Sequence, residues 1–126
     1  MVRVKEYIKS TWETTDIGSP TKIIGIEITL GENSISISQQ NYITDILQQK
    51  HMLAANPIRT PLDHNIQLKP NPDSTNGNRS NPFACLLGEL QLVANATRPD
   101  IAYAVNKLAT YTANPSLQHI TTLKWI

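Results

Sequence analysis

Carboxylates are the side chains of this sequence with the widest chemical use, because paired carboxylates can hold metal ions or move a proton. Two-metal phosphoryl transfer needs several of them to converge on cations about 4 Å apart. Here the acidic residues stand singly on separate predicted elements, as Asp16, Glu27, Asp45 and Asp100 show. We therefore predict no catalytic residue, no bound metal and no cofactor in this chain.

Histidine and cysteine offer no better site. His51, His64 and His119 lack the short spacing of metal-binding histidines on one helix. Cys85 lies in the apolar run 83–90, so we expect it to be buried, and nothing in the sequence predicts a base beside it. Because it has no second cysteine to pair with, it fits a reducing compartment.

The composition is that of a soluble globular protein. Of the 126 residues, 40% are hydrophobic and 17% are charged, which excludes the disordered and membrane classes. The net charge of +1 is not the strong basic excess that nucleic-acid-binding domains often carry. The first 13 residues lack the apolar stretch of a signal peptide, so we expect a cytoplasmic or nuclear protein without a membrane partner.

A helix and a β-hairpin are predicted for the first 38 residues. Apolar side chains recur every four residues near the start, which indicates a helix that ends before Gly18 and Pro20. From Lys22 to Leu30 the isoleucines alternate with other residues, which indicates one strand with one exposed face. A second alternating run at 34–38 follows turn residues and completes the hairpin.

A further helix and a polar connection follow the hairpin. Ser38 can cap a helix whose apolar face runs to about His51. Five of the eight prolines lie between Pro57 and Pro82, and 71–82 is almost wholly polar. This composition predicts an exposed loop.

Three helices are predicted after the loop. The apolar stripe from Phe83 to Ala94 indicates the first, with Gly88 on another face. Thr97 to Asp100 has the pattern of a capping box with proline in the first turn, and it opens the second helix. Ser116 can cap the third, and no stop signal precedes Ile126, which predicts a domain cut before its end. The apolar residues expected in the last two helices are Ile101, Val105 and Leu108, and then Leu117, Ile120 and Leu123.

Short blocks in a fixed order resemble the reverse transcriptases of Ty1/copia-type retrotransposons. The first is Asp16-Ile17-Gly18, followed by Ile24-Gly25-Ile26-Glu27-Ile28. The later ones are Ile37-Ser38-Gln39 with Tyr42, Ile46-Leu47 and Met52, then Thr60-Pro61-Leu62, then Leu87-Gly88 to Leu90, Thr97-Arg98-Pro99-Asp100-Ile101, Asn114-Pro115 and His119. The order of the blocks over nearly the whole chain makes the resemblance specific.

The resemblance implies an α+β fold in three parts. Residues 1–38 would form a palm-edge helix and an antiparallel hairpin similar to a primer grip, and 39–82 a linking helix with a Pro/Asn-rich loop. Residues 83–126 would form a three-helix thumb-like bundle, truncated before any RNase H domain. In this family the aspartates that hold Mg²⁺ lie upstream of the first block, in an early strand and a Y-x-D-D hairpin, and neither is present here. The resemblance therefore implies a fragment that supports the template-primer and is inactive alone.

The same resemblance implies where a nucleic-acid duplex would lie. The first thumb helix of reverse transcriptases presents a strip at i, i+4 and i+8 to the minor groove, and the matching residues here are Ala84, Gly88 and Leu92. Copia-type sequences usually have arginine and tyrosine at the outer positions, so only the glycine is kept and weak binding is expected. Because glycine inside a helix costs about 1 kcal/mol relative to alanine, Gly88 calls for a reason. We favour a close approach by a duplex or a neighbouring helix over a chance occurrence.

Two other candidates also have structural explanations. Gly25 could admit primer backbone, or mark a bulge or a close helix crossing. Arg98 could contact phosphate, but we favour a structural role, in which it pairs with Asp100 or lays its apolar stem over the bundle. The large aromatic residues could stack on bases, but we expect them in the core: Trp12, Tyr103, Tyr111 and Trp125.

Two functions therefore remain open. The chain could be a fragment of an RNA-directed DNA polymerase that contacts an RNA/DNA template-primer duplex. It could instead be a non-catalytic interaction module from a truncated or domesticated element, which pairs with an intact polymerase or with itself. An exposed face bearing Ile24, Ile26 and Ile28 would favour self-association.

Overall fold

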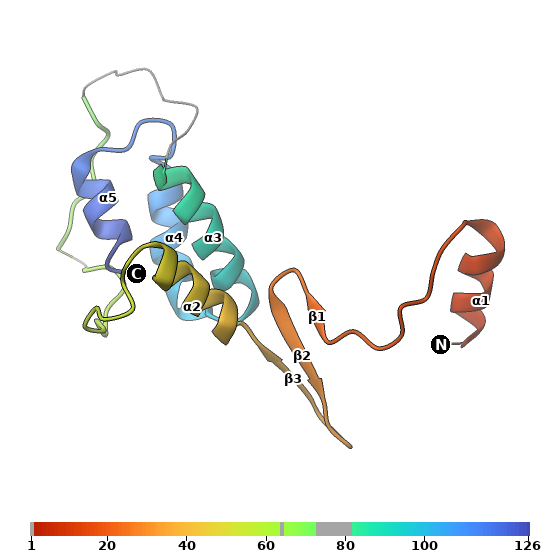
Figure 1. Ribbon diagram of the computed structural model, residues 1–126. Helices are drawn as coiled ribbons and strands as arrows, with labels where there is room; N and C mark the ends of the chain where they lie inside the picture. Colours follow the sequence, from red (N-terminus) through yellow and green to blue (C-terminus); the bar gives the residue numbers. More distant parts are fainter. Residues whose placement is uncertain (1, 64, 73–81) are drawn as a thin grey trace. The chain divides into compact units, whose positions relative to one another are not determined.

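Figure 1 shows a computed structural model of the chain, which describes residues 2–63, 65–72 and 82–126. The chain forms two compact units, Met1–Ile37 and Ser38–Ile126. The strands lie within residues 22–38, toward the end of the first unit. The elements of the second unit after residue 38 are helices. This confirms the predicted α+β class. Most of the predicted polar loop, residues 73–81, lies outside the described residues.

The first unit holds one helix and a small sheet. The helix α1 (Val2–Thr11) is the one predicted from the four-residue period. The sheet has the order β1 (Lys22–Ile23), β2 (Ile26–Leu30) and β3 (Ile35–Ser38). Gly31 donates its main-chain N–H to the Ser34 carbonyl over 2.8 Å, which closes the expected turn between β2 and β3.

The single strand predicted over 22–30 is wrong, because the chain reverses at Ile24 and Gly25. Both residues have positive φ, 48° and 74°, and β1 pairs antiparallel with β2 across them. A two-residue hairpin turn of this kind needs positive φ at both central positions, which glycine adopts freely. Isoleucine rarely adopts it, so the alternating pattern concealed the turn. Gly25 therefore has a conformational role in the reversal.

No described side chain from residue 3 to residue 37 is buried. In β2, Ile26 and Ile28 are half-buried, while 74% of Ile24 is exposed. The apolar face of the hairpin is therefore partly exposed, as predicted.

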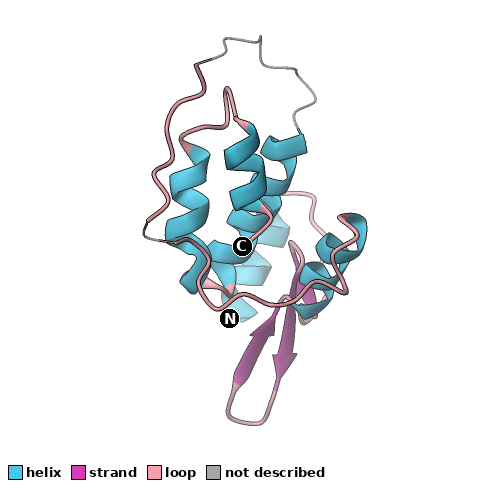
Figure 2. Ribbon diagram, turned by 90° about the vertical axis from the view of Figure 1, so that its left-hand side faces the viewer, coloured by secondary structure: helices cyan, strands magenta, loops and turns pink. Residues whose placement is uncertain are grey.

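The second unit is built from helices that share one core. They are α2 (Gln40–Gln49), α3 (Pro82–Ala96), the 3₁₀ helix η1 (Pro99–Ile101), α4 (Ala102–Ala109) and α5 (Leu117–Leu123). Helices α3, α4 and α5 pack against one another, and Figure 2 shows the unit from the side. The core residues are Ile46, Phe83, Leu87, Val93, Ala94, Ile101, Val105, Leu108 and Leu123. Because α2 contributes Ile46, the predicted linking helix is part of this core.

The buried face of α5 differs from the expected one. Leu123 is buried, but 79% of Leu117 and 37% of Ile120 are exposed. His119 and Thr122 are buried in their place. Ser116 caps the helix as predicted: its Oγ accepts the His119 main-chain N–H at 3.4 Å, and His119 Nδ1 accepts the Ser116 N–H at 2.9 Å. The cap thus fixes the imidazole at the buried side of α5.

The predicted capping box at Thr97 is wrong. The Thr97 hydroxyl donates to Oε1 of Gln39 over 2.7 Å, and the described structure shows no side-chain cap on η1. Gln39 is 98% buried between α2 and the end of α3, and it competes for the hydroxyl that would otherwise cap. Pro99 does begin η1, as expected from its fixed φ.

Both ends of α2 lie within two residues of the predicted ones, which were a cap at Ser38 and an end at about His51. Ser38 Oγ accepts the Gln40 N–H at 3.2 Å, so Gln39 rather than Ser38 occupies the cap position. At the other end His51 has φ of 56°. The His51 N–H reaches the Gln48 carbonyl at 3.1 Å, and the Met52 N–H reaches that of Leu47 at 2.8 Å. This is a Schellman ending with histidine where glycine is usual.

Candidate nucleic-acid interface

Helix α3 presents an open face centred on Gly88. Phe83, Leu87 and Val93 anchor the helix in the core, so the opposite face is turned outward. Gly88 is exposed, and a Cβ built on it would meet no described atom within 4 Å outside the helix's own backbone. No neighbouring helix of the described structure therefore explains this glycine.

The predicted strip lies on that face. Ala84 and Leu92 are one turn before and one turn after Gly88, and both are half-buried. Cys85 is exposed, which contradicts the predicted burial. The reason is helical phase, because Cys85 is three residues from Gly88 and so shares its outward side. The apolar run around it concealed this.

A polar bridge extends the face onto α4. Gln91 Nε2 donates to Asn106 Oδ1 over 3.1 Å, joining α3 to the outer side of α4. Tyr103 and Lys107 are exposed on α4, three residues before Asn106 and one after it. The sequence carries no signal for this pair, since only a structure shows which outer residues of two helices face each other. The face thus combines a flat glycine position with amide groups and one lysine.

Arg98 pairs with Asp100, which is the structural role expected for it. Its Nε donates to Asp100 Oδ1 over 2.8 Å, and its Nη2 donates to Oδ2 over 2.7 Å. The guanidinium hydrogen bond lowers the pKa of Asp100, and the same bond raises the pKa of Arg98. The guanidinium is therefore already engaged by a carboxylate.

Gly25 belongs to the other compact unit, where it forms the turn described above. The structure thus brings Ala84, Gly88 and Leu92 together on one helix of the second unit. Gly25 lies in the first unit.

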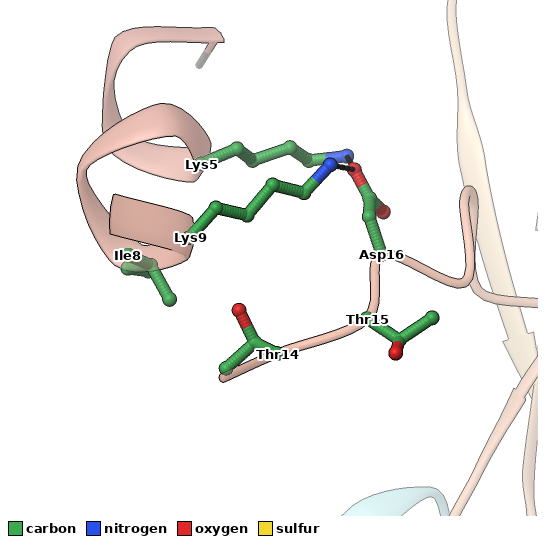
Figure 3. A pocket seen from close by; sticks show the side chains of 6 residues that line it. All are labelled: Lys5, Ile8, Lys9, Thr14, Thr15 and Asp16. Atoms are coloured by element: carbon green, nitrogen blue, oxygen red, sulfur yellow. Dashed lines mark hydrogen bonds and ion pairs between the residues drawn. The ribbon is translucent and has the colours of Figure 1, made fainter. Parts of the chain in front are cut away.

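Asp16 also has a structural explanation. Its carboxylate accepts the Gly18 main-chain N–H at 3.0 Å and lies 3.0 Å from Lys5 Nζ and 3.8 Å from Lys9 Nζ. Figure 3 shows the side chains of Lys5 and Lys9 reaching toward Asp16. These residues line a hollow of 170 Å³. The hydrogen bond from Gly18 and the Lys5 ammonium lower the pKa of Asp16. Asp16 therefore ties α1 to the following turn.

The aromatic residues are mostly not in the core. Trp12, Tyr103 and Trp125 are 58%, 69% and 46% exposed, so their predicted burial is wrong. Tyr111 is half-buried and stacks on His119, with ring centroids 4.1 Å apart. Its hydroxyl donates to the Leu68 carbonyl over 2.9 Å.

His119 is fully buried beneath that contact. Burial lowers the pKa of its imidazole, and a main-chain hydrogen bond to Lys69 opposes the shift. Within the described ranges no three histidine, cysteine or acidic residues lie together as metal ligands would. No helix there has the length and apolarity needed to cross a membrane.

Similarity to known proteins identifies the origin of the chain. It is 29% identical over 133 residues to the retrovirus-related Pol polyprotein from transposon TNT 1-94 of Nicotiana tabacum, a match that includes the whole chain. It is 34% identical over 103 residues, 82% of the chain, to the Pol polyprotein from transposon RE1 of Arabidopsis thaliana. The chain belongs to the family of Ty1/copia-type retrotransposon Pol polyproteins. This Pol segment spans only 10% and 7% of those two relatives.

An uncharacterized mitochondrial protein of Arabidopsis thaliana is also similar to the Pol segment, with 33% identity over 93% of the chain and 48% of its own length. No family model matches the chain. No solved structure matches it either.

Proposed function

We propose that this Pol segment is the template-primer-supporting part of an RNA-directed DNA polymerase, made of a palm edge and a thumb-like bundle without the catalytic aspartates. The segment would act in the cytoplasm or nucleus. Mg²⁺ would belong to the parent enzyme, and we assign no cofactor to the segment. The observation that carries the proposal is the open surface at Gly88 on α3.

Close approach is what a glycine on an outward helix face permits. A duplex could come near the α3 backbone at Gly88, with Ala84 and Leu92 as small or apolar contacts on either side. The amides of the Gln91–Asn106 bridge and the exposed Lys107 supply polar groups beside it. Since few cations are available, the binding would be weak, independent of base sequence and only mildly dependent on salt.

Fluorescence anisotropy with a labelled RNA/DNA hybrid tests this contact. Gly88→Gln places a bulky neutral side chain on the face and should weaken binding at least tenfold. Thr121→Gln, at an exposed position on α5, should change it less than twofold. With one or two phosphate contacts, the slope of log K against log salt should be shallower than about −2. Equal binding by wild type and Gly88→Gln would refute the contact.

The catalytic part of the proposal has its own test. A clean preparation given a primed template and Mg²⁺ or Mn²⁺ should extend no primer, because the sequence contains no Y-x-D-D block and its acidic residues stand apart. Measurable extension that copurifies with the chain would show that catalytic groups exist here after all.

An interaction module is the second candidate, and the exposed apolar residues of the first unit favour it. The exposed fractions of Ile23, Ile35 and Ile37 are 47%, 72% and 54%. Such residues beside unpaired strand edges favour pairing with another copy or with an intact polymerase. Sedimentation analysis at rising concentration should show self-association, and Ile35→Lys should reduce it. A monomer at all concentrations would exclude pairing with another copy, and failure to bind an intact polymerase as well would remove this candidate.

A further inference from the structure

The second unit contains a hollow of 340 Å³ that the proposed duplex contact does not use. It is bounded by α2, by the segment 52–58 that follows α2, by α3, and by the last residues of the chain. Leu90 and Val93 form the α3 wall. They follow Gly88 by two and five residues, which at about 100° per residue places them on the opposite side of the helix. Failure of the duplex proposal would therefore leave this site untouched.

The rim of the hollow is apolar and exposed. Leu53, Ile58 and Trp125 all line it, and they are 58%, 55% and 46% exposed. Hollows of about 300 Å³ or more can enclose a ligand or several side chains. An apolar hollow surrounded by exposed large residues, one of them tryptophan, is typical of a protein-protein contact.

The charged side chains of the lining have one sign. Arg98 and Lys124 both line the hollow, and no acidic side chain does so among the described residues. Arg98 is neutralised by Asp100 at 2.7 Å. Lys124 forms no ion pair in the described parts of the chain. The uncompensated charge of Lys124 thus favours an anionic group beside the apolar one.

We infer that this hollow binds an amphipathic segment of a partner protein, in which bulky apolar side chains enter the hollow and a neighbouring carboxylate pairs with Lys124. The apolar part supplies burial, and the ion pair at the rim selects acidic over basic segments.

Two designed probes test the inference on the full chain. Both are acetylated, amidated ten-residue helical peptides with leucine and phenylalanine on one face, and they carry glutamate or lysine on the other. Titration is followed by the amide resonances of ¹⁵N-labelled protein. We expect the glutamate peptide to shift resonances of residues 52–58 and 124–126, and to bind at least tenfold more tightly than the lysine peptide.

Variants locate the contact. Lys124→Glu should weaken binding of the glutamate peptide at least tenfold and strengthen that of the lysine peptide. Lys69→Glu, at an exposed lysine outside the hollow, should change either less than twofold. Ala55→Trp should block both peptides, since Ala55 is exposed and lines the hollow, so the larger side chain fills it without disturbing the core. Circular dichroism confirms that each variant is folded.

Three outcomes would overturn the inference. Equal binding of the two peptides would mean that the hollow recognises apolarity alone. Binding unaffected by both Lys124→Glu and Ala55→Trp would place the peptide elsewhere. No resonance shift at millimolar peptide would mean that the hollow takes no such segment.

Discussion

Replacing Gly88 by alanine should stabilise the second unit. Gly88 lies inside α3, where glycine costs about 0.8–1.0 kcal/mol relative to alanine because it has more freedom to lose on folding. A Cβ at this position meets no described atom within 4 Å, so no clash offsets the gain. The residue is exposed, so burial adds nothing to it. The expected change in the free energy of unfolding is about +1 kcal/mol.

Urea denaturation followed by circular dichroism measures this change. With an m-value of about 1–3 kcal/mol/M, a gain of about 1 kcal/mol raises the midpoint by about 0.3–1 M. Duplex binding by Gly88→Ala should weaken, but less than binding by Gly88→Gln, because a methyl group obstructs the approach to the α3 backbone less than a glutamine side chain does. Gly88→Gln should gain nearly as much stability and lose the binding.

An unchanged or lower midpoint for Gly88→Ala would refute the reasoning. It would mean that another surface, such as a second copy of the chain, packs against Gly88 and leaves no room for a methyl group. Repeating the denaturation at several protein concentrations separates that cause from an error in the assumed helix propensities of glycine and alanine. Only association makes the midpoint depend on protein concentration.

Three further predictions concern the same unit. His51→Gly should raise its stability by about 0.5–1 kcal/mol in urea denaturation, because glycine relieves the positive φ at the end of α2 but has more freedom when unfolded. Thr97→Val should lower it by about 1–3 kcal/mol, since buried Gln39 loses its hydrogen-bond partner, and Thr97→Ser should retain most of it. Because burial lowers the pKa of His119, the unfolded state takes up its proton first as the pH falls through about 6.5. The unfolding free energy should therefore fall with pH until the folded imidazole also protonates, and His119→Gln should flatten that slope.

Helix positions were predictable from the sequence wherever the spacing of apolar side chains alone determined which residues are buried. The stripe of α3 and the inward residues of α4 follow from the 3.6-residue period alone, and Val105 and Leu108 are fully buried as expected. The Ser116 cap depends only on residues within one turn. Such local features need no knowledge of the rest of the chain.

Other features depend on partners or conformations that local patterns do not specify. The Thr97 hydroxyl is used by Gln39, 58 residues away in the sequence. Ile24 adopts a positive φ that its side chain disfavours, so propensity argued against the turn that exists. The Gln91–Asn106 bridge depends on how two helices are rotated about their axes. Gly88 became a candidate because glycine inside a helix needs an explanation, whereas its polar neighbours gave no such signal.

The distribution of burial also sets the order in which the chain exchanges its amide protons. Every buried side chain described belongs to Ser38–Ile126. The sheet formed by β1, β2 and β3 contains no buried residue. The hairpin amides need only a local opening to meet solvent, whereas those near Val105 and Leu108 must wait for the whole helical unit to unfold. In deuterated water the mass of the chain would therefore rise in two stages, first through the unit Met1–Ile37 and much later through the helices of Ser38–Ile126.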